Sequence, residues 1–268
     1  MIQETCLALG AAGTYLYAIM PEMRHRAEPM KGVFYAHRGL HDRAAGVPEN
    51  SMAAFERAVK AGYGIEMDIQ ITGDEVPVVF HDFTLKRVCH ASGKVTDYTY
   101  EELQEFRLDG TEERIPALSE VLELVNGQVP LLVEMKCPDL KLRICEKADE
   151  LLCRYQGPYT IESFNSAVLY WYRKHRPEIA RGQLAMNFQR REANYTPERF
   201  AVRHLLLNFL AKPDFIAYDI RDKEAISKNL CRKLFGCPSV AWTVRSPKQL
   251  KTIAPYYDSF IFEGFLPQ

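Results

Sequence analysis

The sequence predicts an α/β protein with the fold of a (β/α)8 TIM barrel and a small insertion after the second strand. Three observations favour this fold. Short β-rich runs alternate with helical stretches from Lys31 onward, eight such runs fit within the 268 residues, and no glycine-rich phosphate-binding motif follows any of them. A doubly wound open sheet is the alternative for this alternation, and it would normally carry such a motif. The closed barrel is therefore favoured.

The expected strands are short, apolar and rich in β-branched and aromatic residues. They are residues 33–38, 64–69, 130–136, 159–163, 183–186, 215–219, 240–244 and 259–263. Helical patterns occupy residues 51–61, 117–125, 140–155, 166–175, 197–210, 223–235 and 247–254. The first helix is the clearest, because Met52, Phe55 and Val59 share one face and Asn50 or Ser51 can cap its start.

One strand-like run does not fit the simple alternation. Residues 77–80 (PVVF) follow the strand at 64–69 after only a few residues around Gly73. Parallel neighbours need a crossover of about a dozen residues or more, so we expect a hairpin that pairs antiparallel with the second strand. Residues 77–115 then form an insertion beside the functional site, within one barrel domain at 31–268.

The N-terminal residues 1–30 form a separate apolar segment. No charged residue occurs from Cys6 to Met20, and a basic cluster follows between Arg24 and Lys31. The run is too short for an ordinary spanning helix. One interpretation is a helix packed on the domain; the other is a segment that associates peripherally with a membrane, with the barrel on the cytoplasmic side.

Charge and cysteine content restrict the functional class and the cellular compartment that we expect. The net charge is −1, which gives no overall basic field for nucleic acid. Seven cysteines are scattered without a zinc-like spacing, a pattern typical of reduced thiols in a cytoplasmic protein.

Carboxylates mark two of the strands. Glu66 and Asp68 stand two residues apart, so their side chains lie on the same side of the strand at 64–69. Pointing into a barrel mouth, they would form a cradle for a divalent cation. Glu134 and Lys136 repeat this spacing on the next strand, where they are either a plain ion pair or a third ligand beside a phosphate-binding ammonium.

Two histidines end strands close to these acids. His37 lies at the end of the first strand and is followed by Arg38, while His81 ends the hairpin and is followed by Asp82. Histidine can give or accept a proton near neutral pH. The pair therefore suggests a general acid and a general base.

Several short motifs follow one another in a fixed order along the chain. They are His37-Arg38-Gly39, Pro48-Glu49-Asn50-Ser51, Glu66-x-Asp68, Pro77-Val78-Val79-x-His81-Asp82, Leu85-x-Arg87, Glu134-x-Lys136, Ser163-Phe164-Asn165 and Trp242-Thr243-Val244. In combination, these motifs resemble the glycerophosphodiester phosphodiesterase family. The resemblance covers roughly Phe34 to Phe262, and its specificity comes from the order of the set.

The resemblance implies metal-dependent hydrolysis of glycerophosphodiesters to sn-glycerol 3-phosphate and an alcohol. It implies that Glu66, Asp68 and Glu134 bind Mg²⁺ or Ca²⁺, both of which prefer oxygen ligands. Arg38 and Lys136 would then hold the phosphate oxygens. His37 and His81 would form the acid–base pair, and Glu49 would position Arg38 or a metal-bound water. Trp242 would wall the pocket where the glycerol or alcohol part of the substrate lies.

Two positions depart from the family pattern. The last strand ends Ile261-Phe262-Glu263 where an I-I-T-D-like string is usual, and Arg245 replaces a small polar amide. We expect them to affect substrate preference and to touch neither the metal ligands nor the histidines.

Other activities stay open at this stage. The nucleophile is either water or the neighbouring glycerol hydroxyl. The alternative function is that of a lysophospholipase D-like or cyclising phosphodiesterase, favoured by the apolar N-terminus and by the aromatic residues Tyr98, Tyr100 and Phe106 of the insertion. A protein that only binds phosphodiesters is the third hypothesis.

Overall fold

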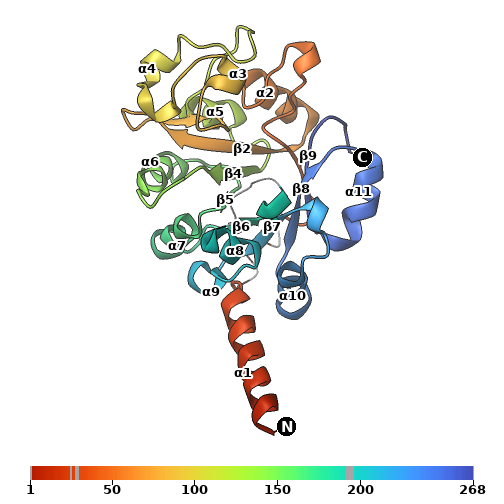
Figure 1. Cartoon of the computed structure of the whole chain (residues 1–268). Helices are drawn as coiled ribbons and strands as arrows, with labels where there is room; N and C mark the ends of the chain where they lie inside the picture. Colours follow the sequence, from red (N-terminus) through yellow and green to blue (C-terminus); the bar gives the residue numbers. More distant parts are fainter. Residues whose placement is uncertain (1, 25, 28–29, 191–195, 268) are drawn as a thin grey trace.

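The computed structural model of the chain describes residues 2–24, 26–27, 30–190 and 196–267. Its eight parallel strands close into a barrel, because β1 pairs with β2 on one side and with β9 on the other. This confirms the predicted fold (Figure 1). The strands are β1 (Phe34–Ala36), β2 (Gly64–Ile71), β4 (Leu131–Met135), β5 (Tyr159–Ser163), β6 (Arg181–Ala185), β7 (Phe215–Asp219), β8 (Ser239–Val244) and β9 (Ser259–Phe262).

Helices surround the barrel and alternate with its strands (Figure 1). In α2 (Met52–Ala61) the Ser51 hydroxyl accepts a hydrogen bond from the Ala54 amide at 3.1 Å, as expected for an N-cap. The helices between the strands include α2, α5 (Leu118–Val125), α6 (Arg143–Leu152), α7 (Ser166–His175), α10 (Ile226–Phe235) and α11 (Pro247–Ile253).

The hairpin after the second strand is confirmed. Strand β3 (Pro77–Val79) pairs antiparallel with the end of β2, where Val79 lies opposite Ile69. The residues that follow include the short helices α3 (Lys86–Cys89) and α4 (Tyr100–Leu103), and they pack around an apolar cluster of their own. Val78, Leu85 and Leu108 belong to this cluster.

The single helix expected at 197–210 is two helices. Helix α8 (Pro197–Arg203) ends where Leu205 adopts φ = 58°, and α9 (Asn208–Ala211) follows after a turn. The Leu206 amide donates to the Ala201 carbonyl at 2.8 Å, which ends the first helix in a tight turn. The apolar pattern continues across the break, so periodicity did not reveal it.

Helix α1 (Ile2–Ile19) projects away from the barrel (Figure 1). Its C-terminal end is anchored on the barrel: Ile19 is fully buried, its carbonyl accepts a 2.9 Å hydrogen bond from Asn208, and the Tyr17 ring lies 5.8 Å from that of Phe209. Leu7 and Leu9, farther along the helix, are exposed. Among the helices of the described residues, none is long and apolar enough to cross a membrane. Residues 25, 28 and 29 of the basic cluster lie outside the described residues.

Six of the seven cysteines have side chains that the structure describes; these carry free thiols, and most are partly or fully buried. They are Cys89, Cys137, Cys145, Cys153, Cys231 and Cys237.

Candidate active site

The carboxyl ends of the barrel strands bring the sequence-predicted residues to one cavity of about 180 Å³. In a (β/α)8 barrel this end of the strands carries the functional residues. Seven of the nine candidate residues line the cavity directly: His37, Arg38, Glu66, His81, Glu134, Lys136 and Trp242. The other two, Asp68 and Glu49, lie behind Arg38 and contact its guanidinium.

The turn after β1 places the first two residues. Arg38 adopts φ = 56° and Gly39 follows with φ = 79°, so the chain turns sharply toward α2. A Cβ atom at Gly39 would lie 2.8 Å from the Cβ of Ala54, and for this reason a glycine is required there. The Arg38 amide donates to Glu66 Oε2 at 2.9 Å, which ties the turn to β2.

Three buried carboxylates converge next to this turn. One ligand atom each from Glu66, Asp68 and Glu134 lies within 4.8 Å of the others. Asp68 and Glu134 are direct partners across the β2–β4 pairing. The Lys136 ammonium lies between them, with Nζ 2.8 Å from Glu134 Oε1 and 3.0 Å from Asp68 Oδ1.

Burial and mutual repulsion disturb the protonation of this group. Burial raises the pKa of Glu66 well above its usual value, and the charges of Asp68 and Glu134 raise it further. Burial also raises the pKa of Glu134. For Asp68 burial acts in the same direction, but the nearby cations outweigh it and hold the pKa well below its usual value.

A fourth carboxylate, which the sequence analysis missed, completes the acidic cluster. Glu162 on β5 is the cross-strand partner of Glu134 and is only 1% exposed. Burial, together with the charges of Glu134 and Asp68, raises the pKa of Glu162 well above its usual value. The signal was present in the sequence as a glutamate near the end of the strand that follows Glu134.

These residues fit a divalent cation. Four buried carboxylates of neighbouring strands face two cations, Arg38 and Lys136, so the cavity lacks positive charge. Among the described residues, Glu162 Oε2 is buried and accepts no hydrogen bond. Oxygen donors of this kind are the ligands that Mg²⁺ and Ca²⁺ prefer.

Each of the two histidines has a carboxylate at its Nδ1 atom. His37 Nδ1 donates a short hydrogen bond to Glu263, and its Nε2 lies 4.0 Å from Glu66 Oε2. His81 Nδ1 lies 2.5 Å from Asp82 Oδ1. Burial and the charge of Arg38 lower the pKa of His37 to about 4, although Glu263 acts in the opposite direction.

A network of ion pairs joins the second histidine to Arg38. Arg87 donates from Nε to Asp82 at 2.6 Å and from both terminal nitrogens to Glu49, at 2.7 and 2.9 Å. Glu49 also accepts a 2.6 Å hydrogen bond from Arg38. This network crosses from the insertion to the turn after β1, so the insertion helps to hold the Arg38 side chain in place.

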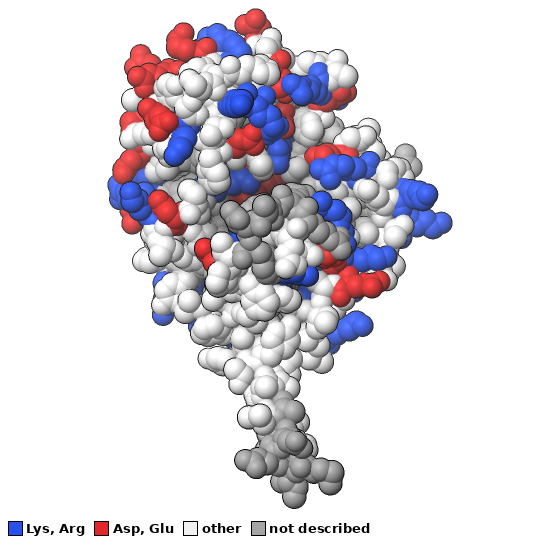
Figure 2. All heavy atoms as spheres, in the orientation of Figure 1, with Lys and Arg blue, Asp and Glu red and all other residues white. Residues whose placement is uncertain are grey.

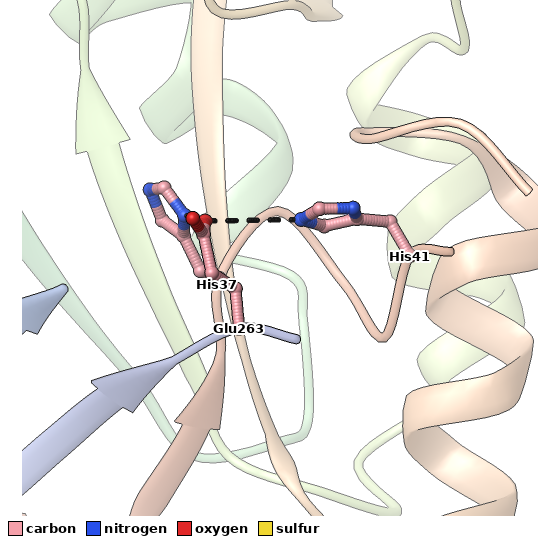
Figure 3. A group of neighbouring side chains, drawn as sticks. All are labelled: His37, His41 and Glu263. Carbon is pink, nitrogen blue, oxygen red and sulfur yellow. Dashed lines mark hydrogen bonds and ion pairs between the residues drawn. The ribbon is translucent and has the colours of Figure 1, made fainter. Parts of the chain in front are cut away.

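The contact between Glu263 and His37 corrects one expectation from the sequence. The sequence predicts that Glu263 affects substrate preference and does not touch the histidines, yet Glu263 lies directly against His37, a candidate catalytic histidine (Figure 3). The pairing was not visible in the sequence because 226 residues separate the two positions. The barrel brings them together, since β1 and β9 are neighbours in the closed sheet.

Apolar side chains form one wall of the cavity. The Trp242 ring lies 5.7 Å from that of Phe164 in an edge-to-face arrangement. Leu184, Met186 and Ile261 extend this wall. The cavity therefore has one strongly charged side and one apolar side, as expected for a site that binds a charged group attached to an uncharged one.

The fold and the site together define a (β/α)8 barrel with a carboxylate, arginine, lysine and histidine cluster at one mouth. The model of the glycerophosphoryl diester phosphodiesterase family matches residues 37–256, so the chain belongs to this family. The match begins at His37 itself and includes the site residues described above except Ile261 and Glu263.

Curated relatives agree with the family. A glycerophosphodiester phosphodiesterase of Bacillus altitudinis is 35% identical over 165 residues, which is 57% of this chain and 66% of that protein. A second, from Caldanaerobacter subterraneus subsp. tengcongensis, is 35% identical over 58% of this chain and 67% of its own length. The aligned part therefore spans about two thirds of these relatives.

Solved structures share the fold. A phosphodiesterase of Oleispira antarctica, solved in complex with sn-glycerol-3-phosphate, superimposes with a TM-score of 0.72 and 24% identity, over 88% of this chain and 94% of that one. At this identity the comparison shows the common architecture.

Proposed function

We propose that this chain is a metal-dependent phosphodiesterase that hydrolyses glycerophosphodiesters to sn-glycerol 3-phosphate and an alcohol. One observation carries the proposal: the buried carboxylates, the two cations and the two carboxylate-bound histidines all meet at one barrel mouth. Membership in the family supports it, as do the printed activities of the relatives.

Glu66, Asp68 and Glu134 would hold the Mg²⁺ or Ca²⁺ ion. When bound, such an ion supplies Lewis-acid stabilisation of charge on a phosphoryl oxygen. Glu162 borders the same cluster and adds a further oxygen whose hydrogen-bonding capacity is unused among the described residues. We propose that it accepts a hydrogen bond from water in the site.

Arg38 and Lys136 would bind the phosphate. Burial alone would lower the pKa of Lys136, but the charges of Asp68 and Glu134 raise it, so the ammonium stays protonated at neutral pH. The Arg38 pKa is likewise raised, with Asp68 and Glu49 outweighing burial. Two fixed cations beside a phosphodiester can neutralise the charge that develops on its oxygens in the transition state.

His37 and His81 would transfer protons on the two sides of the phosphorus. Each ring uses Nδ1 to contact a carboxylate, which leaves Nε2 for the substrate. One histidine removes the proton of the attacking hydroxyl or water, and the other protonates the leaving oxygen. Trp242 would border the glycerol or alcohol part from the apolar wall.

Product analysis tests this function. Purified protein with Mg²⁺ or Ca²⁺ is incubated with glycerophosphocholine, glycerophosphoethanolamine and glycerophosphoglycerol, and sn-glycerol 3-phosphate is quantified. We expect its release from at least one substrate and no release by the His37→Ala/His81→Ala double variant. Equal release by that variant, or none by the parent with either metal, would contradict the proposal.

The alternative activity is release of a lipid phosphate from lysophospholipids, or a cyclising cleavage. Its sequence support is reduced by the structure, because Tyr98 and Phe106 pack against each other within the insertion at 5.2 Å and Tyr100 donates to Glu120. The exposed apolar helix α1 still favours it. A lysophospholipid included in the same assay distinguishes the two, since its product would be a lipid that carries the phosphate.

We also propose that α1 binds peripherally to a lipid surface. Leu7, Leu9 and Tyr17 are 78, 68 and 60% exposed, and no charge interrupts the helix after Glu4. The described surface of the barrel near the C-terminal end of α1 carries few charged side chains compared with the upper part of the same face (Figure 2). Flotation with phosphatidylglycerol vesicles tests this, with the Leu7→Glu/Leu9→Glu variant as comparison. Equal flotation of both proteins, or of neither, would contradict the proposal.

A further inference from the structure

Glu263, the residue after β9, contacts three side chains with its carboxylate. Oε2 accepts a short hydrogen bond from His37 Nδ1, and it lies 3.9 Å from His41 Nε2. Oε1 accepts a 2.5 Å hydrogen bond from Arg245 Nε. Figure 3 shows the Glu263 carboxylate between the rings of His37 and His41.

These contacts fix the hydrogen on the His37 ring. Burial would raise the pKa of Glu263, but the hydrogen bond from His37, the nearby His41 ring and the charge of Arg245 lower it far below its usual value. An ionised carboxylate only accepts hydrogen bonds, so the hydrogen lies on His37 Nδ1. In the neutral ring, Nε2 then carries the lone pair.

The second ring nitrogen faces the acidic cluster. His37 Nε2 lies 4.0 Å from Glu66 Oε2, on the cavity side of the ring. Among the described residues, Glu263 is thus the partner that decides which nitrogen of His37 faces the substrate.

We propose that Glu263 is a positioning residue for His37, which holds the ring in the Nδ1–H tautomer and directs an unprotonated Nε2 into the cavity. The expected effect on kcat rests on the proposed phosphodiesterase function, whereas the tautomer of His37 does not depend on that function. Arg245 has a supporting part, because its guanidinium occupies the other carboxylate oxygen and stops Glu263 from turning away.

A metal ion held by His37, His41 and Glu263 is the competing explanation, since their ligand atoms lie within 4.8 Å of one another. Arg245 argues against it. Its guanidinium already supplies positive charge at Oε1, and a second cation beside it would be repelled. His37 Nδ1, moreover, already donates to Oε2.

The Glu263→Gln variant separates these possibilities. An amide has a single acceptor oxygen, whereas both Arg245 and His37 donate to Glu263. The guanidinium of Arg245 can only donate, so it retains the amide oxygen; the NH₂ group then faces His37 Nδ1 and favours the Nε2–H tautomer. We expect kcat for glycerophosphodiesters to fall about 10–100-fold, the range typical of lost partners behind an active group, with KM unchanged.

Two further variants control for structural damage. Glu146→Gln removes a carboxylate that pairs with Arg143 on the surface of α6, and it should leave kcat unchanged. Adding Arg245→Met to Glu263→Gln frees the amide oxygen to turn toward His37. The double variant should recover kcat toward that of Arg245→Met alone.

Nitrogen NMR of the imidazole rings reads the tautomer directly, with His37 assigned by comparison with His37→Ala. We expect the Nδ1–H form in the parent and its loss in Glu263→Gln. An unchanged tautomer, an unchanged kcat in that variant, or loss of the proton on His37 Nδ1 when stoichiometric Zn²⁺ is added would overturn the proposal. The NMR needs no substrate, so failure of the proposed function appears separately, as a parent without phosphodiesterase activity but with the Nδ1–H tautomer.

Discussion

Lys136 Nζ lies 2.8 Å from Glu134 Oε1, and the same ammonium lies 3.0 Å from Asp68 Oδ1 on the neighbouring strand. One lysine therefore bridges two proposed metal ligands. The sequence left two interpretations of Glu134 and Lys136, an ion pair or a ligand beside a phosphate-binding cation. The geometry is compatible with both, because a bridging ammonium can turn toward an anionic phosphate when a metal takes its place beside the carboxylates.

Chelation should abolish activity, and Mg²⁺ or Ca²⁺ should restore it, because the buried carboxylates repel one another without a cation. Glu66→Gln should weaken metal binding measured by calorimetry while the barrel stays folded, and Glu146→Gln serves as the control. Full activity after exhaustive chelation would disprove the metal assignment.

His37→Ala and His81→Ala should each lower kcat by about 10²–10⁴-fold, the usual contribution of a positioned acid or base. Metal binding should survive in both variants. A nitrophenyl phosphodiester has a leaving group that needs no proton, so it should restore turnover only in the variant that lost the general acid. Parent-like rates in both variants with glycerophosphodiesters would show that the histidines are structural.

Glu49 should make the free energy of unfolding depend on pH in the acidic range. Burial opposes ionisation, but hydrogen bonds from Arg87 and the charge of Arg38 lower the pKa of Glu49 to about 2, from 4.5 in the unfolded chain. The unfolded state thus binds the proton first as pH falls. The stabilisation, about 3 kcal/mol, is complete above about pH 4.5 and is lost as pH falls through about 2.

Urea unfolding of the parent and of Glu49→Gln across this pH range measures the effect. The difference in free energy of unfolding should be largest near neutral pH and should shrink toward pH 2. A difference that does not change with pH would mean that Glu49 acts through packing and not through its charge.

Gly182 should tolerate no side chain. It lies on β6 opposite Phe215 of β7, and an added Cβ would stand 2.0 Å from that ring. Gly182→Ala should destabilise the barrel by about 1–3 kcal/mol, as overpacked cores do. Gly10→Ala in α1, where nothing lies within 4 Å of the added atom, is the matched control and should not destabilise. Thermal unfolding of both variants decides between the two outcomes.

The barrel, its hairpin and most of the site could be predicted from the sequence, because the signals for them are local. Alternation of strands and helices follows from short periodic patterns, and the spacing of Glu66 and Asp68 places both on one side of β2 whatever else the chain does. The few residues between β2 and β3 allowed only antiparallel pairing.

Other features depend on contacts between distant parts of the chain. Glu162 became part of the acidic cluster through the register of β4 with β5, and Glu263 reached His37 because the barrel closes between β1 and β9. The link from Asp82 through Arg87 to Glu49 likewise joins the insertion to the turn before α2. No local sequence pattern indicates that these residues are neighbours. The distances between them are set by barrel closure and by strand register, and closure and register arise only when the whole core packs.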